Sequence, residues 1–506
     1  MAIHDRMNFK KSLPQVRHRL IEMTDYIKPF LPILECHMVN FYTNNLWSKN
    51  VPEKIKVEVE KCNLIVNEFF EESPSIKNSK ELQTFIESAK KYFPSTLDVC
   101  LHEKEFYNLF KDWNCSRANT LLDNSFMSFK KSHEVEVMSN VIKYLSEGFG
   151  CSHILDLGGG KGYLGSVLAL EHKLKVLSID SSSSNTHAAG KRAQKMEKYW
   201  QGIRKRIETG ITRKGKHWKA NPSQNEVTDS PNSSLLSTDK ANKEEKRINF
   251  IDLYKNVTMF VNPDTDVVGV LREKFKEEND DLSIALVGLH TCGNLGPSSI
   301  ELFLKMKSVK LLLNVGCCYH LLTDKFEGEQ ETQVATNLCS YSAGFPMSQL
   351  LLSRGFRLTY NTRVVAAQSV DRIMQDKVIP SANLFYRALV EVLLVEKFKI
   401  EEIFKIGSIK CDSFPEYARK ALKKFELQDK VTDHELDELF NKYEQHWSKL
   451  QIYFMMRVTL APIVEAICLL DRLQYLHEQG IEEAYLVQLF DPVKSPRCYG
   501  ILAVRD

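Results

Sequence analysis

The pattern of apolar and polar positions divides the chain into regions of different predicted structure. In residues 1–125, apolar residues recur at helical spacing, as in Val16, Leu20, Met23 and Ile27. Several short helices are expected rather than one long helix, because prolines interrupt the pattern at positions 14, 29, 32, 52, 74 and 94. We recognise no cluster of catalytic residue types in this region.

From about residue 150, short and almost continuously apolar runs replace the helical spacing. Such runs are typical of strands that are buried on both faces of a parallel sheet. Five of them end at turns: His153–Leu157, Lys175–Asp180, Val257–Val261, Ile284–Leu289 and Val309–Val315. Helical patterns separate several of these runs, which indicates right-handed β–α–β units and a doubly wound fold.

Two further strands are predicted only near the end of the chain, at Ala484–Phe490 and Cys498–Arg505. The segment between them is too short for a crossover helix, so the pair must form an antiparallel hairpin. A seven-stranded, mostly parallel sheet with one reversed strand resembles the core of S-adenosylmethionine-dependent methyltransferases. The predicted fold is therefore α/β, a Rossmann-like class I methyltransferase core with added helical regions.

The same pattern predicts how these parts follow one another along the chain. We expect a helical N-terminal region at 1–125, a core at 126–374, a helical insertion at 375–480 and the last two strands at 481–506. Within the core, residues 220–247 are rich in Asn, Ser, Lys and Glu and have almost no aromatic residues. This composition favours a mobile loop.

Composition narrows the class of protein. The chain has 506 residues, with 68 Lys and Arg against 65 Asp and Glu, so any strongly basic surface must be local. Its 12 cysteines are scattered, mostly singly, which is typical of a reduced cytosolic or nuclear protein. Neither a signal peptide nor an apolar run of the roughly 20 residues that cross a bilayer is recognisable. We expect a soluble protein of the cytoplasm, the nucleus or both, whose oligomeric state the sequence does not determine.

A glycine-rich turn directly follows the first predicted strand. Gly158, Gly160 and Gly162 allow the backbone to turn sharply and to approach a ligand without an intervening Cβ atom. The helix that begins near Tyr163 points its free amide groups and its positive dipole end toward that ligand.

Two carboxylates accompany this turn. Asp156 precedes it, where it can accept a hydrogen bond from the ammonium of an amino-acid ligand, and Asp180 ends the second strand, where it can accept from two ribose hydroxyls. This arrangement predicts S-adenosylmethionine as the cofactor. The overlapping frame Gly160-x-Gly162-x-x-Gly165 also matches the dinucleotide fingerprint. A nicotinamide cofactor, or a turn that holds no ligand, therefore stays open.

Polar and sulfur-containing residues follow the fourth and fifth strands, and we expect them to converge near the transferred methyl group: His290, Cys292, Cys317, Cys318 and Tyr319. His290 is a candidate general base, and Tyr319 is a candidate to stack on, or hydrogen-bond to, a planar acceptor. Cys317 and Cys318 are interpreted as small residues in a tight turn. Together with His290 and Cys292 they also match a zinc ligand set in type, but the usual C-x₂-C spacing is absent, so no metal is predicted.

A basic stretch extends from Lys191 to Lys219. It holds 11 Lys and Arg against two Glu, for a local charge of about +9, and Tyr199, Trp200 and Trp218 are interleaved with them. Phosphate neutralisation combined with base stacking would suit contact with nucleic acid. A solvated helix and loop, with a weak nuclear-import signal, is the alternative.

Many short motifs together resemble the methyltransferase-like protein 25 family (25/25B branch), and the likeness covers nearly the whole chain. The matching segments are Asn40–Trp47, Met127–Val135 with its Lys-Lys-x-His-Glu element, the glycine turn, Leu289–Gly293, Gly316–Tyr319, Gly344–Ser348, Ser413–Tyr417, Leu460–Glu465, Asp471–Arg472 and Ser495–Arg497. Phe129 stands where the family has a proline before the two lysines.

This resemblance implies an S-adenosylmethionine-dependent methyltransferase whose acceptor, RNA or protein, it does not identify. It also implies that Lys131, with Lys130 and His133, lines the cofactor pocket. The Asn-Pro-Pro-Tyr loop of enzymes that methylate adenine or cytosine amino groups is missing after the fourth strand, which argues against base dimethylation by that route. Two alternatives stay open: a non-catalytic scaffold with a vestigial cofactor pocket, and a metal or redox site at the His/Cys cluster.

Overall fold

The computed structural model describes most of the chain. The described residues are 13–61, 66, 69, 79–102, 104–106, 127–209, 250–279, 281–326, 344–376, 380–400, 406–407 and 409–505, and at 201 and 203–209 only the helical backbone is described. The predicted loop at 220–247 and residues 210–219 of the basic stretch lie outside these ranges.

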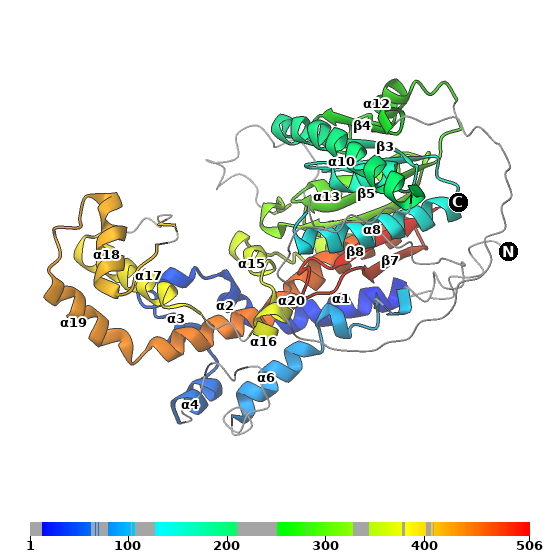
Figure 1. Ribbon diagram of the computed structural model, residues 1–506. Coiled ribbons are helices and arrows are strands. Elements are labelled where there is room, and N and C mark those ends of the chain that lie inside the picture. Colours follow the sequence, from blue (N-terminus) through cyan, green and yellow to red (C-terminus); the bar gives the residue numbers. More distant parts are fainter. Residues whose placement is uncertain are drawn as a thin grey trace, which may run out of the picture.

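One mixed sheet of eight strands forms the centre of the described structure (Figure 1). Its strands are β1 (Cys100–Leu101), β2 (His153–Leu157), β3 (Lys175–Asp180), β4 (Tyr254–Thr258), β5 (Ile284–Cys292), β6 (Val309–Cys317), β7 (Ala484–Gln488) and β8 (Tyr499–Val504). Their order is β1-β7-β8-β6-β5-β2-β3-β4, and β8 runs antiparallel to both of its neighbours while the other pairs are parallel. The predicted α/β fold with a reversed terminal strand is confirmed.

Two strands differ from the prediction. The fourth predicted strand, Val257–Val261, is displaced: β4 begins and ends three residues earlier, because its pairing with β3 ends where Asp180 meets Thr258. The apolar residues after Thr258 line a cavity instead. β1 pairs with β7 at the sheet edge and is not among the predicted strands, since two residues are too few to show an alternating pattern.

The helical connections on the two sides of the sheet centre run toward opposite edges of the sheet. α9 (Tyr163–Leu170) joins β2 to β3, and α13 (Leu295–Lys305) joins β5 to β6 on the other side. Right-handed crossovers that leave the centre in opposite directions put their helices on opposite faces of the sheet. α8 (Phe129–Gly148) and α10 (Ser183–Thr209) pack beside α9. The point of reversal, between β2 and β5, is where open α/β sheets bind their ligands.

Helix α8 begins at Phe129, even though this residue is not a proline. The Ser128 hydroxyl accepts a hydrogen bond from the Lys131 amide and caps the helix, and Phe129 takes the first helical position. Proline is favoured there because its missing N–H is not needed. A capped helix therefore begins at Phe129, at the position where the family that the sequence resembles has a proline.

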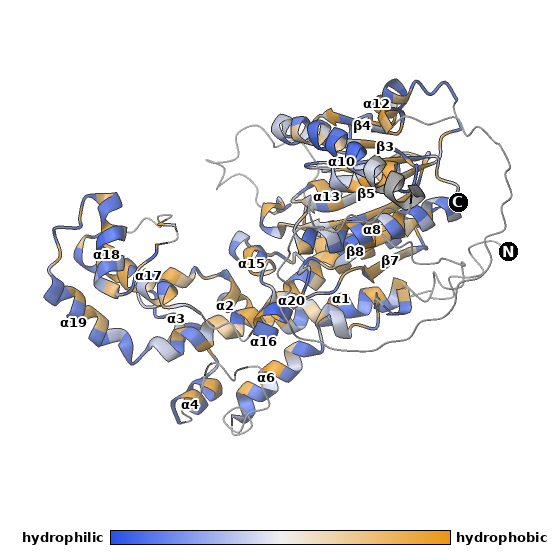
Figure 2. Cartoon of the chain, viewed as in Figure 1, coloured by the Kyte–Doolittle hydropathy of each residue, from blue (hydrophilic) through white to orange (hydrophobic). Residues whose placement is uncertain are grey.

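Helix α20 (Trp447–Glu478) connects the sheet to the N-terminal helices. It contacts β7 and β8, and the N-terminal helices α1 (Leu13–Ile27), α2 (Leu31–Glu35), α3 (Leu46–Asn50) and α6 (Lys80–Lys90) pack against it, whereas α4 (Glu53–Lys61) packs on α6. Within the described ranges, it is the one helix whose length and composition would allow it to cross a membrane, but 89% of its most apolar window is buried in the protein. Figure 2 shows hydrophilic and hydrophobic positions alternating along these neighbouring helices.

A second hydrophobic cluster lies at the far end of α20 (Figure 1). It is formed mainly by α17 (Ala382–Val392), α18 (Phe414–Leu422) and α19 (Asp433–Glu444), which lie between β6 and β7 along the chain. The ring of Phe385 stacks on Trp447 at the start of α20, with centroids 5.2 Å apart. Aromatic packing therefore fastens this helical region to the long helix.

Candidate functional site

A cavity of about 640 Å³ opens at the carboxyl ends of the central strands, at the point of reversal between β2 and β5. Pockets for small molecules and cofactors usually fall in this range of size. Its lining includes Lys131, Asp156, Gly158–Lys161, Asp180, Asn185, Met259–Asn262, Leu289, His290, Cys292 and Leu321. Most of the residues predicted to hold the cofactor thus line a single cavity.

The glycine turn has the left-handed backbone conformation that its glycines predict. Gly158, Gly160 and Gly162 have φ values of +72°, +54° and +71°, a region that other residues rarely adopt. At Gly160 a Cβ atom would meet nothing closer than 3.8 Å, so the backbone there is open to the cavity. Gly162 does not line the cavity. Its missing Cβ atom leaves room for the Tyr254 hydroxyl, which would otherwise lie 2.5 Å away.

The Asp180 carboxylate is held in place by three donors. Its Oδ2 atom accepts a hydrogen bond from the Gly160 amide at 2.9 Å. Its Oδ1 atom accepts from the Ser182 amide at 2.9 Å and from the Asn185 side chain at 3.1 Å. These bonds join the end of β3 to the glycine turn and fix a carboxylate at the cavity wall.

Asp156 is a buried carboxyl with a single neutral donor among the described residues. Only 1% of it is exposed, and its Oδ2 atom accepts from the Ser178 hydroxyl at 2.8 Å. Burial raises the pKa of Asp156 to about 6, against the opposing effect of that hydrogen bond. At neutral pH the carboxylate is thus a buried negative charge that a ligand cation would stabilise.

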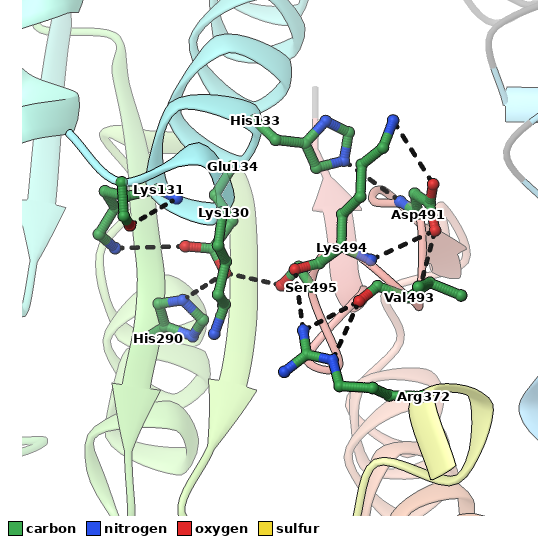
Figure 3. Close-up of polar contacts among 11 residues, drawn as sticks. Lys130, Lys131, His133, Glu134, His290, Arg372, Asp491, Val493, Lys494 and Ser495 are labelled. Carbon is green, nitrogen blue, oxygen red and sulfur yellow. Dashed lines mark hydrogen bonds and ion pairs between the residues drawn. The ribbon is translucent and has the colours of Figure 1, made fainter. Parts of the chain in front are cut away.

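A polar network connects α8, β5 and the segment before β8. Figure 3 shows the Glu134 carboxylate between Lys131 and His290 on one side and Ser495 on the other. Glu134 Oε1 lies 2.9 Å from His290 Nε2 and accepts from the Ser495 hydroxyl at 2.6 Å, and Oε2 lies 3.4 Å from Lys131 Nζ. Lys130 Nζ is 3.5 Å from Oε1.

These contacts decide the ionisation of Glu134. Burial would raise the pKa of Glu134, but the hydrogen bond and attraction of His290, followed by the Ser495 hydroxyl and Lys131, outweigh burial and hold it at about 2. An ionised carboxylate can only accept, so His290 Nε2 must carry a proton. The other ring nitrogen, Nδ1, is then left to accept a proton in the neutral imidazole.

The backbone at His290 is unusual. Its φ is +67°, and the register of β5 against β6 shifts between Leu289 and Thr291. Residues held in the left-handed region cluster at functional sites because the surrounding structure must enforce them. The β5 irregularity turns the His290 side chain to the cavity and to Glu134, which explains why a strand residue reaches both.

Tyr319 requires a correction. It was expected beside the transferred methyl group, but it is 1% exposed, and its hydroxyl donates to Glu465 at 3.2 Å inside the protein. The Arg472 guanidinium lies over its ring, 5.7 Å from the centroid. Cys318, with a φ of +51°, turns the chain so that Tyr319 enters the core. Tyr319 does not line the cavity.

The cysteines behave in part as expected. Cys292 lines the cavity, and its sulfur lies 2.9 Å from the sulfur of Cys317. The hydrogen bond with Cys317 lowers the pKa of Cys292, whereas the same hydrogen bond and burial raise the pKa of Cys317, and burial raises the pKa of Cys318. The three residues converge at the ends of β5 and β6, but Cys317 and Cys318 lie behind Cys292 rather than on the cavity wall.

Two other predictions change. His133 does not line the cavity, since its Nε2 accepts from the Asp491 amide at 3.3 Å (Figure 3). In the basic stretch, Trp200 is 6% exposed and belongs to the hydrophobic core, so it cannot stack on a base. Lys191, Lys195 and Lys198 are exposed on α10.

Sequence reasoning assigned no role to Glu134, Ser495 or Asn185, although the first two stood inside motifs that resemble the family. Glu134 ends the Lys-Lys-x-His-Glu element, and Ser495 begins the Ser-Pro-Arg element. Their joint presence in those motifs was the one available signal, because 361 residues separate them.

Fold and site together define a Rossmann-like methyltransferase domain, and comparison with known proteins agrees. Residues 130–325 match a family model described as "Methyltransferase domain". The chain is 29% identical to "Probable methyltransferase-like protein 25" of Mus musculus and to the Homo sapiens protein of the same name, over 97% of this chain and 97% and 98% of theirs. The resemblance to methyltransferase-like protein 25 is thus confirmed along nearly the whole chain. No solved structure matches.

Proposed function

We propose that the cavity binds S-adenosylmethionine and that the protein transfers the methyl group of this cofactor to an RNA or protein acceptor. One observation carries the proposal: the open backbone at Gly160 is hydrogen-bonded to the fixed carboxylate of Asp180 at the switch point of the sheet. When bound, the cofactor supplies an electrophilic methyl group on a sulfonium.

The residues present suit such a ligand. Asp180 Oδ2 accepts one hydrogen bond and keeps a lone pair for a ribose hydroxyl. Asp156 offers a buried negative charge for the ammonium group of the amino-acid part. The apolar segment from Met259 to Val261 supplies a wall against which a flat base can pack. Lys131 completes the rim above Glu134.

His290 is the candidate base. The Glu134 carboxylate holds its Nε2 proton, so Nδ1 would accept the proton that an acceptor loses on methylation. We propose that the exposed lysines of α10 help to hold a macromolecular acceptor. A protein in the cytoplasm or the nucleus would meet RNA and protein acceptors alike.

The first test is calorimetric titration of the purified protein with S-adenosylmethionine, S-adenosylhomocysteine and NAD. Binding of the first two without NAD is the expected result. The Gly160→Arg variant should lose this binding at least tenfold, because its side chain enters the cavity and its backbone is strained.

Gly480→Arg is the matched control. Gly480 has a φ of +79° and open space around its Cβ position, at the end of α20. It should carry the same backbone strain and leave affinity unchanged. If Gly160→Arg bound S-adenosylmethionine as tightly as the wild-type protein does, the assignment of the cofactor site to this cavity would be wrong. No binding of any ligand by the wild-type protein would favour a non-catalytic scaffold with a vestigial pocket.

A second experiment identifies the class of acceptor. The protein is incubated with cell extract and S-adenosylmethionine that carries a labelled methyl group, and the label is then measured separately in RNA and in protein.

A further inference from the structure

Three cysteine sulfurs meet at the ends of the two strands that border the cavity. The sulfurs of Cys292, Cys317 and Cys318 all lie within 4.8 Å of one another. The chain has 12 cysteines, mostly far apart in sequence. Methyl transfer as proposed above assigns no role to any of these three thiols, so their convergence needs a separate explanation.

Two features of the backbone bring the three thiols together. Cys292 and Cys317 are register partners where β5 and β6 end, which sets their side chains next to each other. Cys318 follows with a φ of +51°, in the left-handed region that favours glycine. A non-glycine residue is strained in this conformation. This strained turn lets consecutive cysteines present their sulfurs to the same point.

We propose that Cys292, Cys317 and Cys318 form a binding site for one thiophilic metal ion of the zinc class. A tetrahedral zinc with Zn–S bonds of about 2.3 Å separates its sulfur ligands by about 3.8 Å. The observed separations, from 2.9 Å for Cys292 and Cys317 up to at most 4.8 Å, bracket this value. Small side-chain rotations would therefore bring all three sulfurs to bonding distance of one ion.

The cluster suggests either a disulfide or a metal site. We favour the metal site, because only a metal ion would use all three thiols. A disulfide between Cys292 and Cys317 would use two of the three sulfurs and leave the Cys318 sulfur, which meets them at the same point, without a role. A zinc ion would use the third sulfur and hold the ends of β5 and β6 together.

The fourth position of the ion would be open. Among the described residues, no His, Asp or Glu atom joins the three sulfurs within 4.8 Å. Cys292 is the cluster member that lines the cavity, two residues after His290. Metal sites with three protein ligands keep the remaining position for water or a bound molecule. The proposed ion would therefore sit beside the cavity, with one position free for such a ligand.

The test measures metal content and does not require S-adenosylmethionine. Its result is therefore independent of whether the proposed function is correct. The full chain is purified in a phosphine reductant, stripped with a chelator and titrated with zinc. One zinc per chain is expected. Titration with cobalt(II) should give the visible bands of tetrahedral coordination and a near-ultraviolet charge-transfer band from thiolate ligands.

Single variants locate the site. Cys292→Ser and Cys318→Ser should each weaken zinc binding at least tenfold, and the cobalt charge-transfer band should fall by about one third if three thiolates become two. Cys292→His restores a ligand and should recover part of the affinity. Cys411→Ser is the control, because Cys411 is a half-buried free thiol in the helical region that bonds to Asn383 and lies outside the cluster.

Three outcomes overturn the proposal. In the first, the reduced wild-type protein holds no zinc, and in the second, Cys411→Ser lowers the affinity for zinc as much as Cys292→Ser does. Mass spectrometry without reductant could instead find a Cys292–Cys317 disulfide in a protein that binds no metal, which would assign the pair to redox chemistry. Circular dichroism of the exposed-site variant Cys292→Ser excludes loss of folding as the cause of lost binding.

Discussion

Two buried carboxyl groups, Asp156 on the cavity wall and Glu134 behind Lys131 and His290, differ in their ionisation because they differ in their partners. Asp156 and Glu134 are each 1% exposed. Glu134 is bonded to His290 and lies near Lys131, and its pKa falls to about 2, whereas Asp156 is bonded to the neutral Ser178 hydroxyl and its pKa rises to about 6. The charge of Glu134 is thus already compensated by the protein, and that of Asp156 is left for a ligand.

Asp156→Asn should stabilise the ligand-free protein and weaken cofactor binding. The pKa of Asp156 is raised from 3.8 to about 6, so stability falls as pH rises through this interval, and the full cost of about 3 kcal/mol is present above pH 6. Asparagine removes the charge and can still accept from Ser178. Thermal unfolding at pH 5 and pH 7 checks the first effect, and calorimetry with S-adenosylmethionine checks the second.

The control for this variant is Asp437→Asn, which alters an exposed carboxyl on α19. It should change neither stability nor affinity. A lower melting temperature of Asp156→Asn at pH 7, without ligand, would contradict the view that the buried charge is unfavourable.

Glu134→Gln should have the opposite effect. The folded pKa of Glu134 is about 2 and its ordinary value is 4.5, so the carboxylate contributes stability above pH 4.5 that is lost as pH falls toward 2. We expect a loss of about 3 kcal/mol at pH 7, which shrinks as the pH is lowered from 5 toward 3. Urea unfolding of wild type and variant across this range measures it.

Glu136→Gln is the matched control, since Glu136 is an exposed residue two positions further along α8. It should leave the pH profile of stability unchanged. An equal loss in both variants, or a loss that does not depend on pH, would show that Glu134 acts through packing rather than through its charge.

At the scale of elements, α20 joins the parts of the fold through buried polar residues as well as apolar ones. Asp471 is fully buried and accepts from the amides of Met347 and Ser348 and from the Ser348 hydroxyl. Arg472 fills the space next to Gly316, where an added Cβ atom would lie 2.5 Å from its Nη1 atom. Residues of one helix turn thereby hold the loop before α14 (Gln349–Ser353) and support the end of β6.

Asp471→Ala should destabilise the protein by about 3 kcal/mol or more, because two buried amide groups and a hydroxyl lose their acceptor. The loss of stability is read from urea unfolding, and faster cleavage near 344–353 in limited proteolysis would locate it. Asp437→Ala on α19 controls for the loss of an exposed carboxyl. A stability within 1 kcal/mol of wild type would mean that water replaces the carboxylate at these donors.

At the scale of the whole molecule, the site is assembled from segments at both ends of the domain. Glu134 lies in α8, which directly precedes β2, His290 lies two residues before the end of β5, and Ser495 lies between the last two strands. The reversed strand β8 makes this possible, because it runs between β6 and β7 and brings the preceding segment back to the carboxyl ends of the parallel strands. The Lys-Lys-x-His-Glu and Ser-Pro-Arg motifs thus meet in one contact through Glu134 and Ser495.

The sequence by itself determined the features that depend on neighbours in the chain. Burial on both faces makes strands continuously apolar, a seven-residue connection excludes a crossover, and a left-handed turn requires glycine, so the sheet, its reversed strand and the turn at Gly158–Gly162 could be predicted. The position of Asp180 followed from the end of a strand in the same way.

Only the tertiary structure decided which side chains meet. Tyr319 and Trp200 carry chemistry suited to ligands, but their burial assigns them to the core, and no local pattern distinguishes the two cases. The contact of Glu134 with His290 and Ser495 depends on the packing of three distant segments. Hydrogen bonds and burial set the ionisation of such groups, and both arise only when the chain is folded.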